Sequence, residues 1–147
     1  MARTELTEQE MKIWLMYKET FKAIFGRITK ENYDKTGVSD GDYMVLDLLT
    51  SSQAGGLRQQ ELADGMGWSK SRLSHHLTRM EKRGLIEKRP LDKGNAIQVV
   101  ITPKGTSAFD AVRPISANGI KRYFIDMLTE QDMEWIAGLA SRVREAS

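Results

Sequence analysis

The chain has 147 residues, which is enough for one domain with a full core. Its 22 basic and 20 acidic side chains leave a net charge of +2, which is too small by itself to indicate a nucleic-acid partner. It contains no cysteine, which excludes disulfides, thiolate metal sites and a cysteine redox switch. The N-terminus lacks the apolar region of a signal peptide and no apolar run approaches the ~18 residues that span a bilayer, so we expect a cytoplasmic protein without a membrane partner.

The first predicted helix runs from Thr7 to about Tyr33. Thr7 stands three residues before Glu10, which is a helix-capping signal. Apolar side chains then recur at helical spacing from Met11 to Ile28 and form a wide stripe that needs a packing partner.

Two shorter helices follow. The second starts at Ser39, with Asp42 as its capping acid, and carries Tyr43, Met44, Leu46, Leu48 and Leu49. After a loop over residues 51–56, the third spans about Arg58 to Met66, and the glycines around Met66 then break the chain for a turn. We expect Trp68 to pack on Leu73 as a hydrophobic staple rather than to stack on a ligand.

The fourth predicted helix begins at Ser69 and has one narrow apolar stripe, made by Leu73, Leu77 and Met80. The opposite face is polar and basic and presents Ser71, Arg72, His75, Thr78, Arg79 and Lys82. No acid occurs between Ser69 and Met80, whereas the helix starts at Thr7, Ser39 and Thr129 each have one. Such a start leaves free N–H groups and a positive field for an outside anion, and DNA phosphate is the obvious candidate.

The positive charge is concentrated around this helix. Residues 68–93 contain eight Lys or Arg and three acids, a local charge of +5, so the remainder carries about −3. Two interpretations remain open for the basic face taken alone: a recognition helix, or an ordinary solvated surface.

Strands and two long helices complete the chain. After Gly84, residues 85–90 and 97–101 are predicted as the strands of a hairpin, with a tight turn at Gly94 and Asn95. A fifth helix starts at Thr102-Pro103 and runs to about Met127, with a bend expected at Pro114, and a sixth runs from Thr129 to about Arg144. Helix, turn, helix and hairpin in this order make a winged helix-turn-helix, so the predicted fold is mainly α with a small β-hairpin wing.

The broad apolar faces of the terminal helices are explained either by an intertwined dimer interface or by packing within one chain, and periodicity cannot distinguish the two. We favour the dimer, because a single recognition helix is a weak DNA ligand alone.

With these blocks in order, the chain resembles the MarR family of bacterial transcription regulators over essentially its whole length. The residues that carry the resemblance are Gln60-Glu61-Leu62-Ala63, Ser69-Lys70-Ser71-Arg72-Leu73-Ser74-His75, Arg79-Met80-Glu81-Lys82-Arg83-Gly84-Leu85-Ile86, the wing opening at Asp92, and Val99-Val100-Ile101-Thr102.

The resemblance implies one MarR-type domain over residues 1–147, with a winged helix-turn-helix module at 37–102 and a helical dimerisation region at 7–35 and 103–146. It further implies an obligate homodimer that binds double-stranded DNA at a pseudo-palindromic operator, and we expect a repressor. The candidate DNA-binding residues are Ser69, Lys70, Ser71, Arg72, His75, Thr78, Arg79, Lys82, Lys93 and Asn95. Arg72 is the favoured base-reading residue, because an arginine that reads guanine is worth roughly 1–3 kcal/mol of discrimination.

The predicted wing departs from the family pattern. The family's wing arginine, which enters the minor groove, falls at Asn95 here, and Lys93 is the nearest cation that could reach a phosphate. We therefore expect a weaker minor-groove contribution.

The family commonly binds small aromatic or anionic effectors between the dimer helices and the winged module. The resemblance makes Trp14, Tyr17, Tyr43, Met44 and Asp47 the effector-binding candidates, although an ordinary core role is favoured for each one taken singly.

Other function classes have less support. His75 and His76 are adjacent, so on a helix they point about 100° apart and cannot readily share one metal. The sequence has no Gly-rich phosphate loop, nucleophile elbow or HExxH signature, so we expect no enzyme, no catalytic residue, no metal and no cofactor. The remaining alternatives are a winged-helix protein-interaction module and a general DNA binder without an effector.

Overall fold

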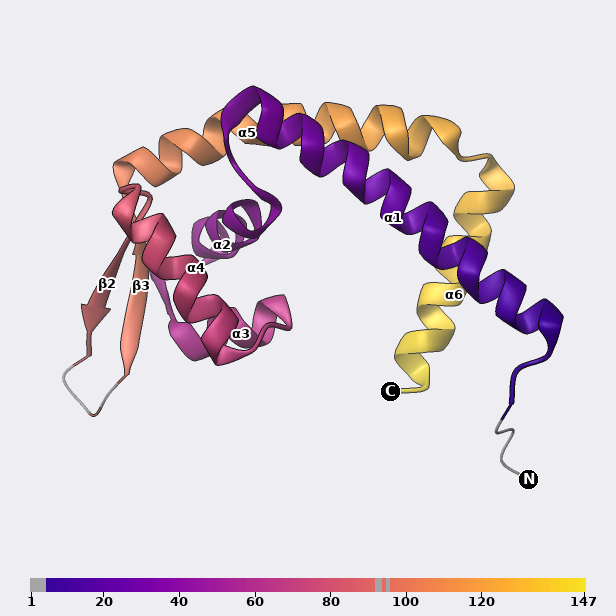
Figure 1. The fold of residues 1–147 in the computed structure, drawn as a ribbon, viewed down its shortest axis with the longest axis horizontal. Coiled ribbons are helices and arrows are strands. Elements are labelled where there is room, and N and C mark those ends of the chain that lie inside the picture. Colours follow the sequence, from indigo (N-terminus) through magenta and orange to yellow (C-terminus); the bar gives the residue numbers. More distant parts are fainter. Residues whose placement is uncertain (1–4, 92–93, 95) are drawn as a thin grey trace. The chain divides into compact units, whose positions relative to one another are not determined.

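A computed structural model describes residues 5–91, 94 and 96–147, and over these residues the chain is mainly helical with one small antiparallel sheet, as predicted (Figure 1). The elements are α1 (Glu8–Thr36), α2 (Asp40–Ser51), β1 (Gly56–Arg58), α3 (Gln59–Met66), α4 (Lys70–Lys82), β2 (Ile86–Pro90), β3 (Ile97–Ile101), α5 (Pro103–Tyr123), the 3-10 turn η1 (Ile125–Met127) and α6 (Glu130–Glu145).

Residues 29–116 form one compact unit, which we call the winged unit. Its core is built by the apolar stripes of α2, α3 and α4 together with the sheet and the first half of α5. The core cluster consists of Val38, Val45, Leu46, Leu49, Leu62, Ala63, Met66, Leu73, Leu77, Met80, Leu85, Ile86, Val99, Phe109 and Val112. The stripe predicted for the fourth helix, Leu73, Leu77 and Met80, is therefore fully buried, and its polar face is the side left for solvent.

The sheet has three strands in the order β1-β3-β2, whereas the sequence indicated only the β2–β3 hairpin. The hairpin pairs Ile86 with Ile101 and Pro90 with Ile97. The strand that was missed, β1, pairs Gly56 with Val100. It has three residues, too few to show an alternating pattern. A Cβ at Gly56 would lie 2.9 Å from the Val99 carbonyl oxygen, so this close approach of two backbones requires glycine.

The predicted helix starts are confirmed by their hydrogen bonds. Ser39 and Asp42 form a reciprocal capping box at α2, and Thr129 and Asp132 form one at α6. The end of the fifth helix differs from the prediction, because α5 ends at Tyr123 and not near Met127. The chain there tightens into η1, where Met127 N–H bonds the Phe124 carbonyl three residues back, a 3-10 pattern that apolar periodicity does not distinguish from an α-helix.

Residues 5–28 and 117–147 form the second unit, which we call the terminal unit; it comprises most of α1, the end of α5, η1 and α6. Among its described residues, Ile28 is the one large apolar side chain that is buried, and α6 has no buried residue. Along the described residues, no helix is both long and apolar enough to cross a membrane.

Candidate nucleic-acid interface

The start of α4 is shaped by the turn that precedes it. Gly67 adopts the left-handed conformation that ends α3 (φ +66°), and the Trp68 N–H donates to the Ala63 carbonyl at 3.1 Å. Ser69 then caps α4, its hydroxyl oxygen accepting from the Arg72 N–H at 3.2 Å. The Ser69, Lys70 and Ser71 side chains are exposed and the first turn contains no acid, so this helix end presents a positive field to solvent.

An acid-free start is not peculiar to α4, because the first turn of α5 also has no acid. The two starts differ in access. A Cβ at Gly105, in the first turn of α5, would lie 2.1 Å from the Leu85 carbonyl oxygen, so that end of α5 is packed tightly against the chain before β2. Of these two starts, the one at α4 is open to an outside anion.

Most of the predicted DNA-binding residues on and just before α4 are exposed, and Ser71, Arg72, His75, Arg79 and Lys82 share one face of the helix. Ser69, Lys70, Ser71, Arg72, His75, Arg79 and Lys82 are all exposed. Thr78 is half-buried and its hydroxyl has partners within the chain: it donates to the Ser74 carbonyl at 2.9 Å and accepts from Lys88 Nζ at 3.0 Å. Thr78 therefore links α4 to β2.

Two of the predicted contacts, Lys93 and Asn95, lie outside the described residues. The cation that the structure adds beside α4 is Lys88 of β2, which in the sequence is one of several residues of the local positive charge. Besides the bond to Thr78, its backbone N–H donates to Glu81 Oε2 at 3.0 Å. Lys88 holds the wing strand against the second half of α4.

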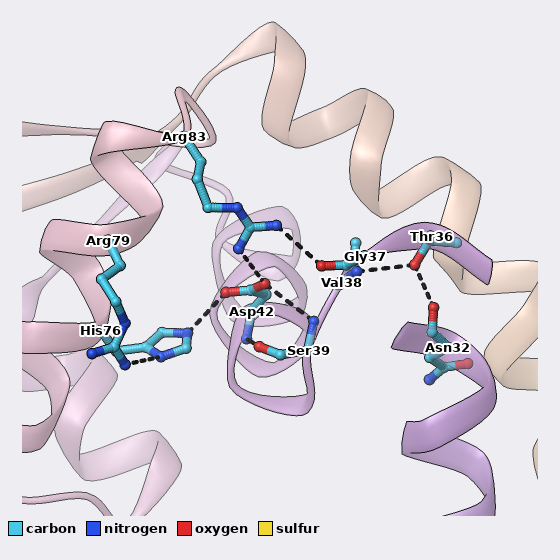
Figure 2. A network of polar contacts seen from close by, with 9 residues as sticks. All are labelled: Asn32, Thr36, Gly37, Val38, Ser39, Asp42, His76, Arg79 and Arg83. Atoms are coloured by element: carbon cyan, nitrogen blue, oxygen red, sulfur yellow. Dashed lines mark hydrogen bonds and ion pairs between the residues drawn. The ribbon is translucent and has the colours of Figure 1, made fainter. Parts of the chain in front are cut away.

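A buried carboxylate anchors α4 to α2 (Figure 2). Asp42 is 1% exposed. Its Oδ1 lies 2.9 Å from His76 Nε2, and its Oδ2 accepts from Arg83 Nη1 at 2.7 Å and from the Ser39 backbone N–H at 3.1 Å. Arg83 also donates to the Gly37 carbonyl at 3.1 Å, which ties the end of α4 to the segment between α1 and α2.

The electrostatics of this network keep Asp42 ionised. Burial by itself raises the pKa of the Asp42 carboxyl, but the hydrogen bonds from His76, Arg83 and Ser39 outweigh burial and hold the pKa well below its usual range. The Arg79 guanidinium, which can only donate, lies 3.4 Å from His76 Nδ1, so this nitrogen is the acceptor and Nε2 carries the proton that is donated to Asp42.

The sequence does not predict this network. In the sequence, Asp42 is recognisable only as a capping acid, and His76 only as a neighbour of His75 that is poorly placed to share a metal. The partners are 34 and 41 residues apart, and nothing in the local pattern of either segment points to the other. The one available signal was an Asp on the inward side of an amphipathic helix, where a carboxylate needs a partner.

The effector candidates fall into two groups. In the terminal unit, the rings of Trp14 and Tyr17 stack at 6.0 Å between centroids, and both side chains are about half exposed. In the winged unit, Tyr43 and Met44 pack against the core cluster, with Tyr43 5.6 Å from the Phe109 ring, while Asp47 is exposed. Tyr43 and Met44 thus have the surroundings of residues at the edge of the core.

In the described part of the chain, no group of three or more His, Cys, Asp or Glu residues is arranged to hold a metal ion. His75 and His76 have different surroundings, since His75 is exposed whereas His76 faces Asp42.

Comparison with known proteins identifies the fold. A family described as a domain of unknown function (DUF7343) matches residues 38–100, and no curated protein matches the chain. Among solved structures, AbsC, a MarR family transcriptional regulator from Streptomyces coelicolor, is 27% identical, with a TM-score of 0.85 and coverage of 97% of this chain and 96% of its own.

Two further solved structures are similar to this chain. Sco3205, a MarR family regulator from the same organism solved in complex with DNA, is 23% identical, with a TM-score of 0.86 and coverage of 97% of this chain and 90% of its own. CouR from Rhodococcus jostii RHA1, bound to p-coumaroyl-CoA, is 20% identical, with a TM-score of 0.72 and coverage of 89% and 90%. AbsC and Sco3205 are both described as MarR family transcriptional regulators. The chain is thus a structural relative of the MarR family of transcriptional regulators, whose winged helix-turn-helix fold it shares.

Proposed function

We propose that this protein is a transcriptional regulator that binds a pseudo-palindromic operator in double-stranded DNA as a homodimer, and that it acts as a repressor. The observation that carries the proposal is α4: a capped, acid-free and exposed helix start continues into an exposed face with Arg72, Arg79 and Lys82. A helix of this kind supplies both phosphate contacts at its N-terminus and side chains for the major groove. The residues 37–102 act as the DNA-binding module in this proposal.

DNA is a better partner for this face than an acidic protein. Backbone N–H groups and Ser69 at the helix start suit phosphate oxygens, while the arginines that follow suit the edges of bases. The structure of Sco3205, which was solved in complex with DNA, supports DNA as the ligand, because 97% of this chain aligns with it.

The homodimer is supported by the terminal unit. Trp14, Tyr17, Phe21 and Phe25 of α1 form a continuous row of rings, with centroids 6.0, 6.0 and 4.7 Å apart, and each ring is about half exposed. Exposed apolar surface of this extent is typical of an interface. A second copy of the chain also supplies the second α4 that a two-half-site operator requires. Residues 7–35 and 103–146 are the proposed dimerisation region.

A small aromatic or anionic effector is proposed to release the protein from DNA. The proposed contacts of the effector are Trp14 and Tyr17, whose rings are exposed, and Tyr43, Met44 and Asp47 of α2. CouR is a structural relative that holds an aromatic thioester, p-coumaroyl-CoA. Such a ligand acts if it binds better to a state of the dimer that does not fit DNA. The test is to titrate phenolic carboxylates into the protein–operator complex and to follow the release of labelled DNA.

The first experiment is a fluorescence-anisotropy titration with the DNA upstream of the protein's own gene, beside unrelated DNA, at two salt concentrations. We expect preferential binding, with affinity falling steeply with salt at a log–log slope of about −0.9 per phosphate neutralised. Arg72→Ala should lower the affinity for the operator about tenfold, whereas Arg113→Ala, an exposed arginine of α5, should not change it.

The other outcomes separate the alternatives. Equal and weak binding to both DNAs, with the same salt dependence, would indicate a general DNA binder. Absence of binding to either DNA at low salt would contradict the proposal and favour a protein-interaction module.

A further inference from the structure

The Trp68 ring lies at the junction of α2, α3 and α4. Its backbone is held by the Schellman-type bonds that end α3, in which Trp68 N–H donates to the Ala63 carbonyl and Gly67 N–H to the Asp64 carbonyl. The side chain is half-buried and packs against the core cluster, which includes Leu73, the residue with which a staple was expected. A Cβ at Gly41 of α2 would lie 2.9 Å from Trp68 Cη2, so the α2 backbone closes on one side of the ring.

Two side chains of α4 contact this ring. His76 meets it edge to face, with centroids 5.4 Å apart and the planes at 90°. The Arg72 guanidinium carbon lies over the ring at 3.7 Å from its centroid, which is van der Waals distance for a cation on a π face. Because His76 is itself hydrogen-bonded to the buried Asp42, the ring beneath Arg72 is fixed from two directions.

The Arg72 side chain is otherwise unengaged. In the part of the chain that the structure describes, its guanidinium takes part in no hydrogen bond or ion pair, and its exposed edge faces solvent. Stacking occupies only the face of a guanidinium, so all five N–H donors around its edge stay available. The arrangement therefore restrains the orientation of the side chain without using the groups that read a base or a phosphate.

We propose that Trp68 is a positioning residue that pre-orders Arg72 for base recognition, and that His76, anchored on Asp42, holds Trp68 in place. The proposal rests on the proposed function, since it assigns the origin of the specificity of that DNA-binding site. Its physical basis is that a long arginine side chain loses rotamer freedom when it is immobilised at an interface. If the free protein has already ordered Arg72, that entropy is not lost on binding the correct base.

The test compares Trp68→Leu, which keeps apolar bulk but removes the π face, with Trp68→Phe, which keeps a flat ring. Each is made in the wild-type and Arg72→Ala backgrounds, and each is titrated with the operator and with operators altered at single base pairs. We expect Trp68→Leu to lose about three- to tenfold in discrimination, at the same base pair that Arg72→Ala affects. We expect Trp68→Phe to retain most of it, and the double variant to be no worse than Arg72→Ala.

A purely structural role for Trp68 predicts a different pattern: a loss of affinity that is equal for all operators and adds to the effect of Arg72→Ala. That result would overturn the inference. Thermal unfolding followed by circular dichroism verifies that each variant is folded. Should Trp68→Leu fail to fold, Trp68→Met carries the same comparison, because it also keeps apolar bulk without a π face.

NMR of the free protein provides a readout that does not involve DNA. We expect the Arg72 Nε–H resonance, identified by its loss in Arg72→Lys, to be shifted upfield by the Trp68 ring and to return to the usual arginine position in Trp68→Leu. An unshifted resonance in the wild type would contradict the stacking itself. Lack of preferential DNA binding by the wild type would overturn the proposed function and this inference together, whereas preferential binding with additive variants would overturn the inference alone.

Discussion

At the scale of single residues, Asp42 links α2 to α4. It is a buried carboxylate that accepts from His76 of α4, from Arg83 just after α4, and from the backbone of Ser39, which caps its own helix. A buried charge is tolerated only when it is paired and hydrogen-bonded, and removing one partner leaves the others without theirs.

We therefore expect Asp42→Asn to lower the free energy of unfolding by about 2–4 kcal/mol at pH 7. The pKa of Asp42 is lower in the folded state than in the unfolded state. The stability that the ionised carboxylate gives the folded protein is therefore fully present above the unfolded pKa of about 3.9, and it is lost as the pH falls toward the folded pKa. Urea unfolding at pH 7, 5 and 3 should thus show the difference between the wild type and Asp42→Asn shrinking below about pH 4.

Asp110→Asn is the matched control, because Asp110 is an exposed aspartate on α5. It should leave the free energy of unfolding unchanged within about 0.5 kcal/mol. A difference between wild type and Asp42→Asn that is the same at pH 7 and pH 3 would show that the carboxylate charge is not what stabilises the network.

At the scale of elements, the sheet leaves no room for a larger side chain where β1 meets β3. β1 follows α2 after a few residues and pairs with the edge of β3 that faces away from β2. Its backbone therefore approaches Val99 closely at Gly56. Lys88 of β2 bonds Thr78 of α4, so the hairpin contacts the same helix that presents the basic face.

Gly56→Ala should destabilise the protein by about 1–3 kcal/mol, because the added Cβ meets the Val99 carbonyl oxygen at 2.9 Å and the backbone must shift. Thermal unfolding measures the effect, with Gly65→Ala as the comparison. A Cβ at Gly65 lies 3.3 Å from the end of the flexible Leu48 side chain, and alanine is the better helix former by up to ~1 kcal/mol, so that variant should be neutral or more stable. Equal effects of the two variants would contradict the close backbone approach at β1.

At the scale of the whole molecule, burial is uneven between the two units. The winged unit has its own core of fifteen apolar residues, and this explains why its helices are found where the apolar pattern predicts them. Among the described residues of the terminal unit, large apolar side chains such as Trp14, Phe21 and Trp135 are about half exposed. A stripe that its own chain does not cover is the reason to propose a second copy as its partner.

We expect the wild type to sediment as a dimer. Phe21→Asp should raise the dissociation constant of the dimer at least tenfold, because burying a charge in the row of rings costs more than ~1.4 kcal/mol. Analytical ultracentrifugation measures the shift. Ala23→Asp places the same charge at an exposed position on nearly the opposite side of α1, about 160° away from Phe21, and should leave the dimer intact. A monomeric wild type, or a Phe21→Asp variant that remains fully dimeric, would contradict the proposed interface.

The sequence predicted much of the fold because most of its signals are local. Ser39 with Asp42, and Thr129 with Asp132, are capping pairs three residues apart, and the Leu73, Leu77 and Met80 stripe repeats with the helical period. The basic face of α4 follows from the same periodicity. Shorter or tighter pieces, such as the three-residue β1 and the 3-10 turn after Tyr123, carry too little pattern to be recognised in this way.

The sequence by itself determined the helices, their capped starts, the hairpin and the exposed basic face of α4, because each depends on residues within a few positions of one another. Only the tertiary structure decided which of those residues have partners. Asp42 meets His76 and Arg83 across 34 and 41 residues, Thr78 is held by Lys88, and the Arg72 guanidinium lies over Trp68. Such pairings depend on how helices pack against each other, and the spacing of apolar residues along one helix contains no information about which polar side chain of another helix it will meet.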